Sequence, residues 1–354
     1  MNPCRPAIPL TRRRFLGRFL PALLACAGAP FLAAEGPAPR KGRSRISGTL
    51  WWIVPQEFQQ MGLEGWRKEL DEQQAIGFDL LWLCNVPALL EKQGFGLRHL
   101  LDLCAERNVE VILDMGTTGP WHAKLDVKTE LAACGDNIRK IGKSFGGHPA
   151  FHAWYIPHEI YMCWDAMDRY IQELYPGLVQ ACKAAASLLV TLSPFFILDR
   201  TGVFGDFKFN EPEEYRDYWT ALIRRSGLDI VMLQDSGEHF SYVTNDQRRP
   251  FFEAMSKACR RAGARFWANV EVAEMECASL EEYIRRYGRV HHSQARAIPW
   301  RPVPLSRLRD KLALAAEYAE RMVSWGYREY CRPGTTPAAR AWYDAYRAFV
   351  KTGT

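Results

Sequence analysis

The sequence of 354 residues lacks several patterns that mark common functional classes. None of its ten cysteines forms a C-x-x-C pair, so the usual spacing of a structural zinc site is absent. No uninterrupted apolar run reaches the about 20 residues that a stable membrane span needs. The first expected strand, residues 48–54, is followed by no glycine-rich turn of the kind that binds nucleotide phosphates. These absences disfavour a structural zinc site, a stable membrane span and a doubly wound sheet that binds nucleotide phosphates.

Basic charge is concentrated at the amino terminus. The formal net charge is +6, from 46 Lys and Arg residues against 40 Asp and Glu residues. Residues 1–45 contain nine basic residues and one acidic residue, an excess of eight, so the rest of the chain carries a net charge of −2. Because no global basic field remains, we expect no nucleic-acid partner.

Residues 1–35 resemble a signal peptide of the twin-arginine type. Arg12 and Arg13 precede a weakly apolar stretch, residues 19–34, that two prolines interrupt. This stretch is too short to span a bilayer stably. The twin-arginine pattern directs folded proteins to export.

Three expectations about organisation follow from this signal. The mature protein is periplasmic or secreted, residues 36–45 form a polar linker, and residues 46–354 form one domain. A lipid anchor at Cys26 is the less favoured alternative, because the residues before it match a lipoprotein cleavage site poorly. Sequence patterns give no oligomeric state and no disulfide pairing.

The domain alternates between apolar strands and amphipathic helices. Strands are predicted at residues 48–54, 78–86, 110–115, 151–156, 188–192, 229–233, 266–271 and 323–327. Helices are predicted at residues 63–76, 97–107, 127–145, 166–185, 212–226, 246–262, 280–287, 305–322 and 338–350. Eight strands that alternate with helices predict an α/β fold, a single-domain (β/α)8 TIM barrel. An open, doubly wound sheet is the alternative.

Two of these strands lead into a glutamate. Pro157 ends the strand at residues 151–156, because proline cannot donate to a sheet ladder, and His158 and Glu159 follow at once. The strand at residues 266–271 ends on Glu271. In a parallel barrel the carboxyl ends of the strands carry the chemistry. Glycoside hydrolysis needs two carboxyl groups, so we predict that Glu159 and Glu271 are catalytic.

Other side chains near strand ends are candidates for substrate binding. Polar groups can hold sugar hydroxyls, and a tryptophan offers a flat face to a sugar ring. The candidates are His158, Gln234, Asp235, Asn269, Trp52, Trp121, Trp154, Trp267 and Tyr330, with Trp51, Trp164 and Trp325 as further stacking candidates. Each has a structural alternative: His158 can orient Glu159, Asp235 can be a hydrogen-bond partner, and any tryptophan can fill the core.

No metal and no cofactor are predicted. His291 and His292 are adjacent but have no acidic residue close by, which is a weak metal signal. Metal-dependent hydrolytic barrels usually place a His-x-His at the end of the first strand, where this chain has Trp51 and Trp52.

The placement of the two glutamates resembles that in the large clan of retaining glycoside hydrolases with (β/α)8 barrels. The motifs YIPHEI, LQDS and FWANVE more closely resemble those of an exported bacterial family of barrel proteins grouped with the glycoside hydrolases. This resemblance implies that Glu159 is the acid/base and Glu271 the nucleophile. One departure is His158, which stands where the clan usually has an asparagine that contacts the sugar 2-hydroxyl.

We therefore predict an exported glycoside hydrolase that acts on a polysaccharide or oligosaccharide, with a retaining two-carboxylate mechanism. A barrel without catalysis that binds polysaccharide in an export or assembly system is one alternative. A lyase or transglycosylase on the same scaffold is another.

Overall fold

The computed structural model describes residues 44–90, 96–204, 207–236, 239–290 and 298–352. These residues belong to one compact unit, Glu35–Thr354. The predicted signal peptide, Cys26, most of the predicted linker and the His291–His292 pair lie outside the described residues.

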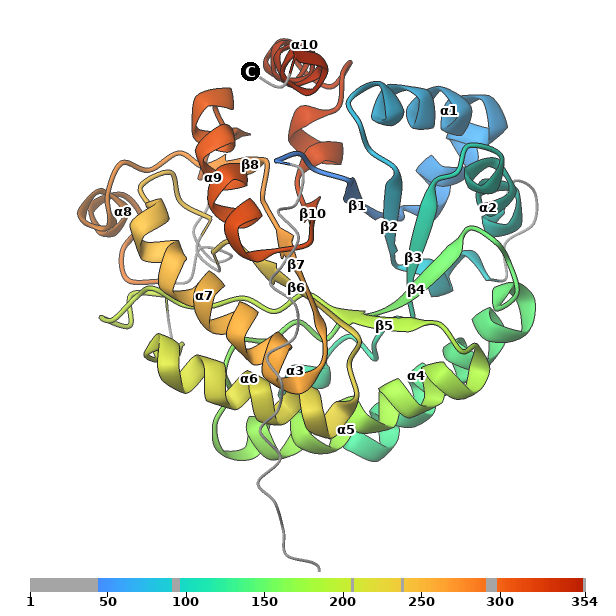
Figure 1. Cartoon of the computed structure of the whole chain (residues 1–354), viewed down its shortest axis with the longest axis horizontal. Helices are drawn as coiled ribbons and strands as arrows, with labels where there is room; N and C mark the ends of the chain where they lie inside the picture. The colour runs from blue at the N-terminus through green and yellow to red at the C-terminus, as the bar shows by residue number, and fades with distance from the viewer. Residues whose placement is uncertain (1–43, 91–95, 205–206, 237–238, 291–297, 353–354) are drawn as a thin grey trace, which may run out of the picture. The chain divides into compact units, whose positions relative to one another are not determined.

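Eight parallel strands close into a barrel, which confirms the predicted (β/α)8 fold (Figure 1). Their order around the barrel is β1-β10-β7-β6-β5-β4-β3-β2. The strands are β1 (Gly48–Trp52), β2 (Leu80–Cys84), β3 (Glu110–Asp114), β4 (Phe151–Ile156), β5 (Leu189–Leu192), β6 (Ile230–Gln234), β7 (Arg265–Asn269) and β10 (Arg321–Ser324). Each predicted strand overlaps one of them.

Helices surround the barrel, as Figure 1 shows. The main helices are α1 (Pro55–Ala75), α2 (Leu97–Glu106), α4 (Val127–Phe145), α5 (Asp165–Ala185), α6 (Pro212–Ser226), α7 (Asn245–Ala262), α8 (Leu280–Tyr287), α9 (Leu305–Tyr318) and α10 (Pro337–Thr352). Local sequence signals fix the ends of several helices. The Asp126 side chain accepts a hydrogen bond from the backbone N–H of Thr129 and caps α4. Gly227, in the left-handed conformation at φ 74°, ends α6.

The side chains of each strand alternate between two apolar layers. On β4, Ala153 and Tyr155 belong to the cluster inside the barrel, whereas Trp154 and Ile156 pack in the layer between the strands and the helices. The same alternation on β6 turns Met232 inward. Because successive strand residues point to opposite faces, this alternation decides which side chains reach the barrel mouth.

Three features differ from the sequence-based prediction. Helix α1 begins at Pro55 rather than at residue 63, with a break at Gly62, whose φ is 54°. Helix α9 ends at Tyr318, and Ala319 is extended, because the apolar residues that follow it belong to β10 rather than to the helix. Short elements were not predicted at all: helix α3 (Trp121–Lys124), the 3-10 helix Val86–Leu89 and the π-helix Tyr327–Cys331.

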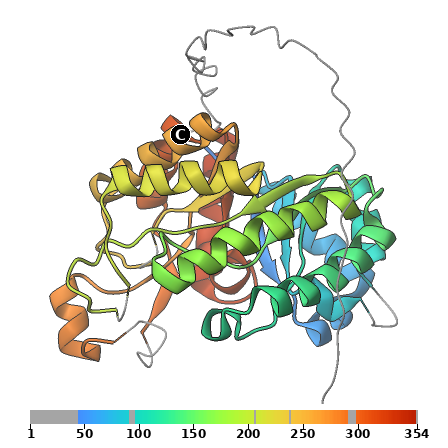
Figure 2. The ribbon, with the colours of Figure 1, turned by 90° about the horizontal axis from the view of Figure 1, so that it is seen from below.

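A small antiparallel hairpin, β8 (Ala273–Met275) with β9 (Trp300–Pro302), also lies outside the prediction. It adjoins a separate apolar cluster that includes Phe204, Phe240 and Tyr283 of α8. In both views α8 lies at the periphery, away from the barrel strands (Figures 1 and 2).

The eight cysteines in the described part of the chain are all buried and free. Within that same part, no helix combines the length and apolar character needed to cross a membrane.

Candidate active site

A cavity of about 540 Å³ lies at the carboxyl ends of the barrel strands. This volume is within the range typical of small-molecule sites, about 300–1,000 Å³. Its lining residues are Leu50, Trp52, Cys84, Trp121, Tyr155, Pro157, Glu159, Gln234, His239, Asn269, Glu271 and Trp325. The structure thus brings Glu159, Gln234, Asn269, Glu271, Trp52 and Trp121 of the sequence-predicted set together, with Trp325 of the further stacking candidates.

Glu159 lies three residues beyond the end of β4 and keeps part of its surface open to the cavity. The Tyr155 hydroxyl donates a hydrogen bond to Oε1, and the Gln234 side-chain amide donates one to Oε2 at 2.9 Å. Loss of water around the carboxyl group raises the pKa of Glu159, and the nearby Glu271 raises it further. The two hydrogen bonds and His239 act in the opposite direction without cancelling the rise.

Glu271 lies two residues beyond the end of β7 and is 2% exposed. His239 donates a hydrogen bond from Nδ1 to Oε2 at 2.7 Å. The Lys311 ammonium group donates to the backbone oxygen of Glu271, also at 2.7 Å. Burial raises the pKa of Glu271, while His239 and Lys311 oppose the rise and Asp235 adds to it.

The two carboxyl groups therefore have partners of different kinds. Both hydrogen-bond donors to Glu159, a phenol and an amide, are neutral. Glu271 has an imidazole that can carry a positive charge, and a lysine behind it. Neutral partners are compatible with a protonated carboxylic acid, whereas cationic partners favour a carboxylate.

Aromatic rings form one wall of the cavity beside Glu271. Trp325 lines the cavity, and the His239 ring lies 5.8 Å, centroid to centroid, from both Trp325 and Trp300. Tyr330 does not line the cavity; its ring stacks on Trp300 at 5.4 Å and so braces this wall from behind. The substrate contact by Tyr330 stays a prediction, because its ring is only partly buried.

His239 is a site residue that the sequence analysis missed. It lies on the loop after β6, five residues beyond the strand end at Gln234, and contacts Glu271 of another loop. The sequence pointed to His239 only through its residue type, because histidine is the side chain that most often exchanges protons near neutral pH.

Trp154, Asp235 and His158, which were also predicted to bind substrate, point away from the cavity because successive side chains alternate along each strand and its continuation. Trp154, 0% exposed, packs outside the barrel and donates from its indole N–H to the Ala186 carbonyl at 3.3 Å. Asp235 is 1% exposed and pairs with Lys311 at 2.7 Å, whereas its neighbour Gln234 lines the cavity.

His158 is likewise fully buried, on the outer side of the barrel. Its Nε2 donates to Oε1 of Glu130 at 2.8 Å, and its ring meets the Trp121 ring at 5.1 Å. It therefore supports Trp121, a lining residue, in place of the predicted sugar contact.

Trp267 points into the barrel but does not reach its mouth. It is 0% exposed, and the guanidinium groups of Arg265 and Arg321 lie 5.5 and 5.0 Å from its ring centroid. Asn269, two residues later in the same inward row, is the residue that lines the cavity. The predicted substrate contact by Trp267 is thus replaced by core packing.

One buried cluster has the residue types of a metal site. Polar atoms of Glu130, Cys134 and His158 lie within 4.8 Å of one another. However, these groups already bond to the protein: Glu130 accepts from His158 and from the Thr118 backbone at 3.0 Å, and Cys134 lies 3.3 Å from the Gly116 carbonyl. The cluster is a hydrogen-bonded support behind Trp121 rather than a set of open ligands.

The chain also contains a Gly-x-Ser-x-Gly sequence at Gly142–Gly146. In α/β-hydrolases the serine of this motif sits on a sharp turn between a strand and a helix. Here Ser144 lies in the last turn of α4, before β4, so the motif forms no nucleophile turn.

Comparisons with known proteins agree with this architecture. A family model described as a domain of unknown function (DUF4434) matches residues 46–340. A search of the curated proteins gives no match. Among solved structures, a candidate alpha-L-fucosidase from Bacteroides thetaiotaomicron VPI-5482 matches with a TM-score of 0.67 and 17% identity, over 94% of this chain and 99% of that one.

Two further structures share the fold. An endo-beta-1,4-mannanase from Thermotoga petrophila matches with a TM-score of 0.53 and 12% identity, over 87% of this chain and 77% of that one. A beta-galactosidase from Rahnella sp. R3 matches with a TM-score of 0.57 and 10% identity, over 88% of this chain and 57% of that one. At these identities the matches establish the fold alone. The chain belongs to the DUF4434 family, with a (β/α)8 fold that matches glycosidase structures.

Proposed function

We propose that this protein is a glycoside hydrolase that cleaves an oligosaccharide or polysaccharide by a retaining mechanism. One observation carries the proposal: Glu159 and Glu271, from two different strand ends, line one cavity with neutral partners around the first and cationic partners around the second. Such a difference between two carboxyl groups is what acid and nucleophile roles require.

In the first step, Glu271 attacks the anomeric carbon of the bound sugar. Its Oε2 accepts a hydrogen bond from His239, so Oε1 is the oxygen that attacks. The glycosidic bond breaks as Glu159 gives its proton to the leaving oxygen. The products of this step are a glycosyl ester on Glu271, a carboxylate at Glu159 and the released alcohol end of the glycan.

In the second step, the Glu159 carboxylate takes a proton from a water molecule, which attacks the same anomeric carbon. The ester bond to Glu271 breaks, and the sugar leaves with the configuration that it had in the substrate. Glu159 is protonated again, and both carboxyl groups return to their starting states.

Aromatic and amide side chains supply substrate contacts. Trp52, 52% exposed, together with Trp121 and Trp325, offers ring faces to sugar units. The side-chain amide of Asn269 donates to the Ser193 hydroxyl at 3.2 Å, and its side-chain oxygen, Oδ1, has no hydrogen-bond partner within the described part of the chain. Since a buried acceptor is costly to leave unpaired, this oxygen is suited to a sugar hydroxyl.

The test is hydrolysis of a panel of bacterial exopolysaccharides and plant glycans, followed by reducing-end release and product masses. We expect cleavage by the wild type and a loss of about 10²–10⁴-fold in Glu159→Gln and in Glu271→Gln. Glu64→Gln, on the surface of α1, is the matched control and should keep full activity. Unchanged hydrolysis in either site variant would contradict the proposal.

Two other outcomes would identify the alternative functions. Binding of a glycan that is neither cleaved nor affected by the substitutions would indicate a binding barrel. An unsaturated product that absorbs in the ultraviolet would indicate a lyase. We also propose that the chain is exported through the signal at residues 1–35, which would place it where such glycans occur.

A further inference from the structure

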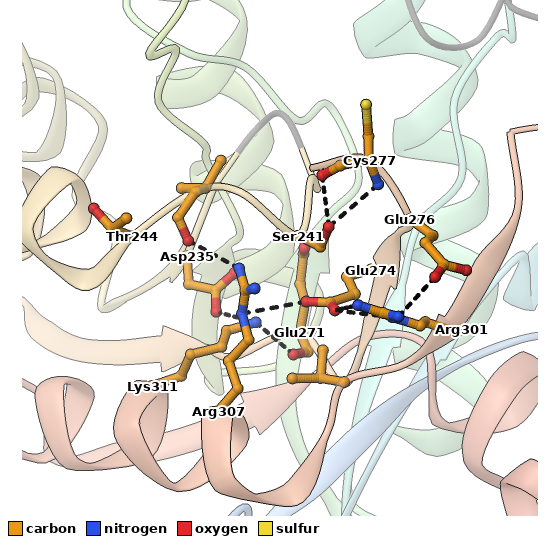
Figure 3. A network of polar contacts seen from close by, with 12 residues as sticks. Asp235, Ser241, Thr244, Glu271, Glu274, Glu276, Cys277, Arg301, Arg307 and Lys311 are labelled. Carbon is orange, nitrogen blue, oxygen red and sulfur yellow. Dashed lines mark hydrogen bonds and ion pairs between the residues drawn. The ribbon is translucent and has the colours of Figure 1, made fainter. Parts of the chain in front are cut away.

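Lys311 of α9 is buried directly behind Glu271. Its side chain is 5% exposed, and its Nζ lies 2.7 Å from the backbone oxygen of Glu271 and 2.7 Å from Oδ2 of Asp235. Figure 3 shows the ammonium group between these two residues. A lysine that is withdrawn from water in this way needs a compensating negative charge, and Asp235 supplies it.

Asp235 does not line the cavity, and its carboxylate pairs with Lys311. The carboxylate is 2% exposed, and the backbone oxygen of Asp235 accepts a hydrogen bond from Arg248 of α7 at 2.8 Å. The preceding residue, Gln234, points inward and is the one that reaches Glu159. The pair of Asp235 and Lys311 thus lies outside the cavity lining but in contact with its Glu271 segment.

On the cavity side, Glu271 forms a second pair with His239 at 2.7 Å. The two pairs together contain two carboxyl groups and two groups that can be cationic. When all four are ionised their charges sum to zero. Charge balance of this kind lowers the cost of keeping ionised groups in a site with little water.

The other charges around this set come from five elements. Glu159 faces His239 from the β4 loop, and Arg248 of α7 faces Lys311. Arg307 of α9 contacts Glu274 of β8 at 3.3 Å, and Arg301 of β9 contacts Glu274 at 3.1 Å and Glu276 at 2.9 Å (Figure 3). The outer arginines are thus largely matched by their own glutamates.

We propose that Lys311 is a positioning residue that, with His239, holds Glu271 as a carboxylate so that a buried glutamate can act as nucleophile, and that Asp235 keeps the buried Lys311 charged. The nucleophile role rests on the proposed function; the charge balance itself does not. Glycosylation would move one negative charge from Glu271, as it becomes an ester, to Glu159, as it gives up its proton. His239 faces both groups, so one cation would serve both steps.

Histidine NMR titration tests the charge balance without any substrate. The chain has eight histidines, and the His239 signal is assigned by its loss in His239→Gln. In Lys311→Met the titration midpoint of His239 should move up by about one pH unit, because a neighbouring cation is removed. In Asp235→Asn it should move down by a similar amount. The double variant should return it close to the wild-type midpoint.

A midpoint unchanged in both single variants would overturn the proposal, whatever the enzyme does with glycans. If Lys311→Met does not fold, Asp235→Asn and the neutral double variant still decide the question. Lys257→Met removes the lysine of an exposed pair with Glu253 on α7 and is the matched control. It should leave the His239 titration unchanged.

An activity profile then tests the link to catalysis. In Lys311→Met the acidic limb of kcat/KM against pH should move up, since protonation of Glu271 becomes easier, and the double variant should reverse the movement. A shifted NMR midpoint without a shifted acidic limb would refute the nucleophile role and leave the charge balance intact. Absence of hydrolysis by the wild type would refute the proposed function alone.

Discussion

Asp114, at the end of β3, should make the protein less stable as the pH rises. The carboxylate accepts hydrogen bonds from the backbone N–H groups of Asn85 at 3.0 Å and Val86 at 2.8 Å. These bonds hold the turn after β2, where Asn85 adopts a left-handed conformation at φ 66°. Burial nevertheless dominates and raises the pKa of Asp114 from its ordinary value of 3.8 to about 6.

The sign and size follow from linkage between protonation and folding. A carboxyl group with a raised pKa stabilises the fold fully below its unfolded pKa of 3.8 and loses this contribution as the pH rises through about 6. The difference between the two values, at about 1.36 kcal/mol per pH unit, corresponds to about 3 kcal/mol. Most of this amount should disappear between about pH 4 and pH 7.5.

Urea unfolding of the wild type and Asp114→Asn, followed by tryptophan fluorescence, isolates this contribution. The asparagine cannot accept from both backbone N–H groups, so the variant should be less stable than the wild type at every pH. At neutral pH the difference in the free energy of unfolding should be about 1–3 kcal/mol. The gap between the two proteins should be larger at about pH 4 than at about pH 7.5, by about 2–3 kcal/mol. A gap that is constant, or that grows with pH, would refute the reasoning.

Three further predictions concern the barrel, the chemistry and export. Gly48→Ala should destabilise the protein by about 3 kcal/mol or more in the same urea assay, because an added Cβ would lie 2.0 Å from the Leu80 carbonyl oxygen. The control Gly147→Ala should be close to neutral, because no neighbouring atom lies within 4 Å of the added Cβ. The pH dependence of kcat/KM should be bell-shaped, falling on the acidic side as Glu271 is protonated and on the basic side as Glu159 ionises. Tyr155→Phe removes a hydrogen-bond donor to the Glu159 carboxylate and should therefore move the basic limb to higher pH. A basic limb that does not move would contradict the assignment of Glu159 as the acid. Replacement of Arg12 and Arg13 by lysine should keep the protein inside the cell, as immunoblots of cell fractions would reveal, whereas unimpaired export would exclude the twin-arginine route.

The barrel could be predicted because its signals are local. Apolar runs of strand length, separated by amphipathic helices with caps such as Asp126 and stops such as Gly227, recur eight times along the chain. The hairpin of β8 and β9 could not be predicted in this way. Its two strands have three residues each, and they pair across more than twenty intervening residues.

At the cavity, the sequence predicted where the strands end better than it predicted which side chains there point into the cavity. Glu159 and Gln234 line the cavity, whereas their neighbours His158 and Asp235 point the other way. The alternation of strand side chains, counted on from the inward Tyr155, would have separated Glu159 from His158. Lys311 had no comparable signal, because its partner Asp235 is 76 positions away and only the closed barrel brings them together.

The most direct measurement of the central claim is the fate of Glu271 during turnover. A glycan that the wild type cleaves would be given to the wild type, and the first-formed product would be followed by proton NMR. The Glu159→Gln variant would be given an aryl glycoside of the same sugar, whose leaving group needs no proton, and the quenched reaction would be mapped by peptide mass spectrometry. The account predicts a product that retains the anomeric configuration of the substrate and a sugar ester on the peptide that contains Glu271. A product of inverted configuration, with no sugar on that peptide and full activity in Glu271→Gln, would contradict it.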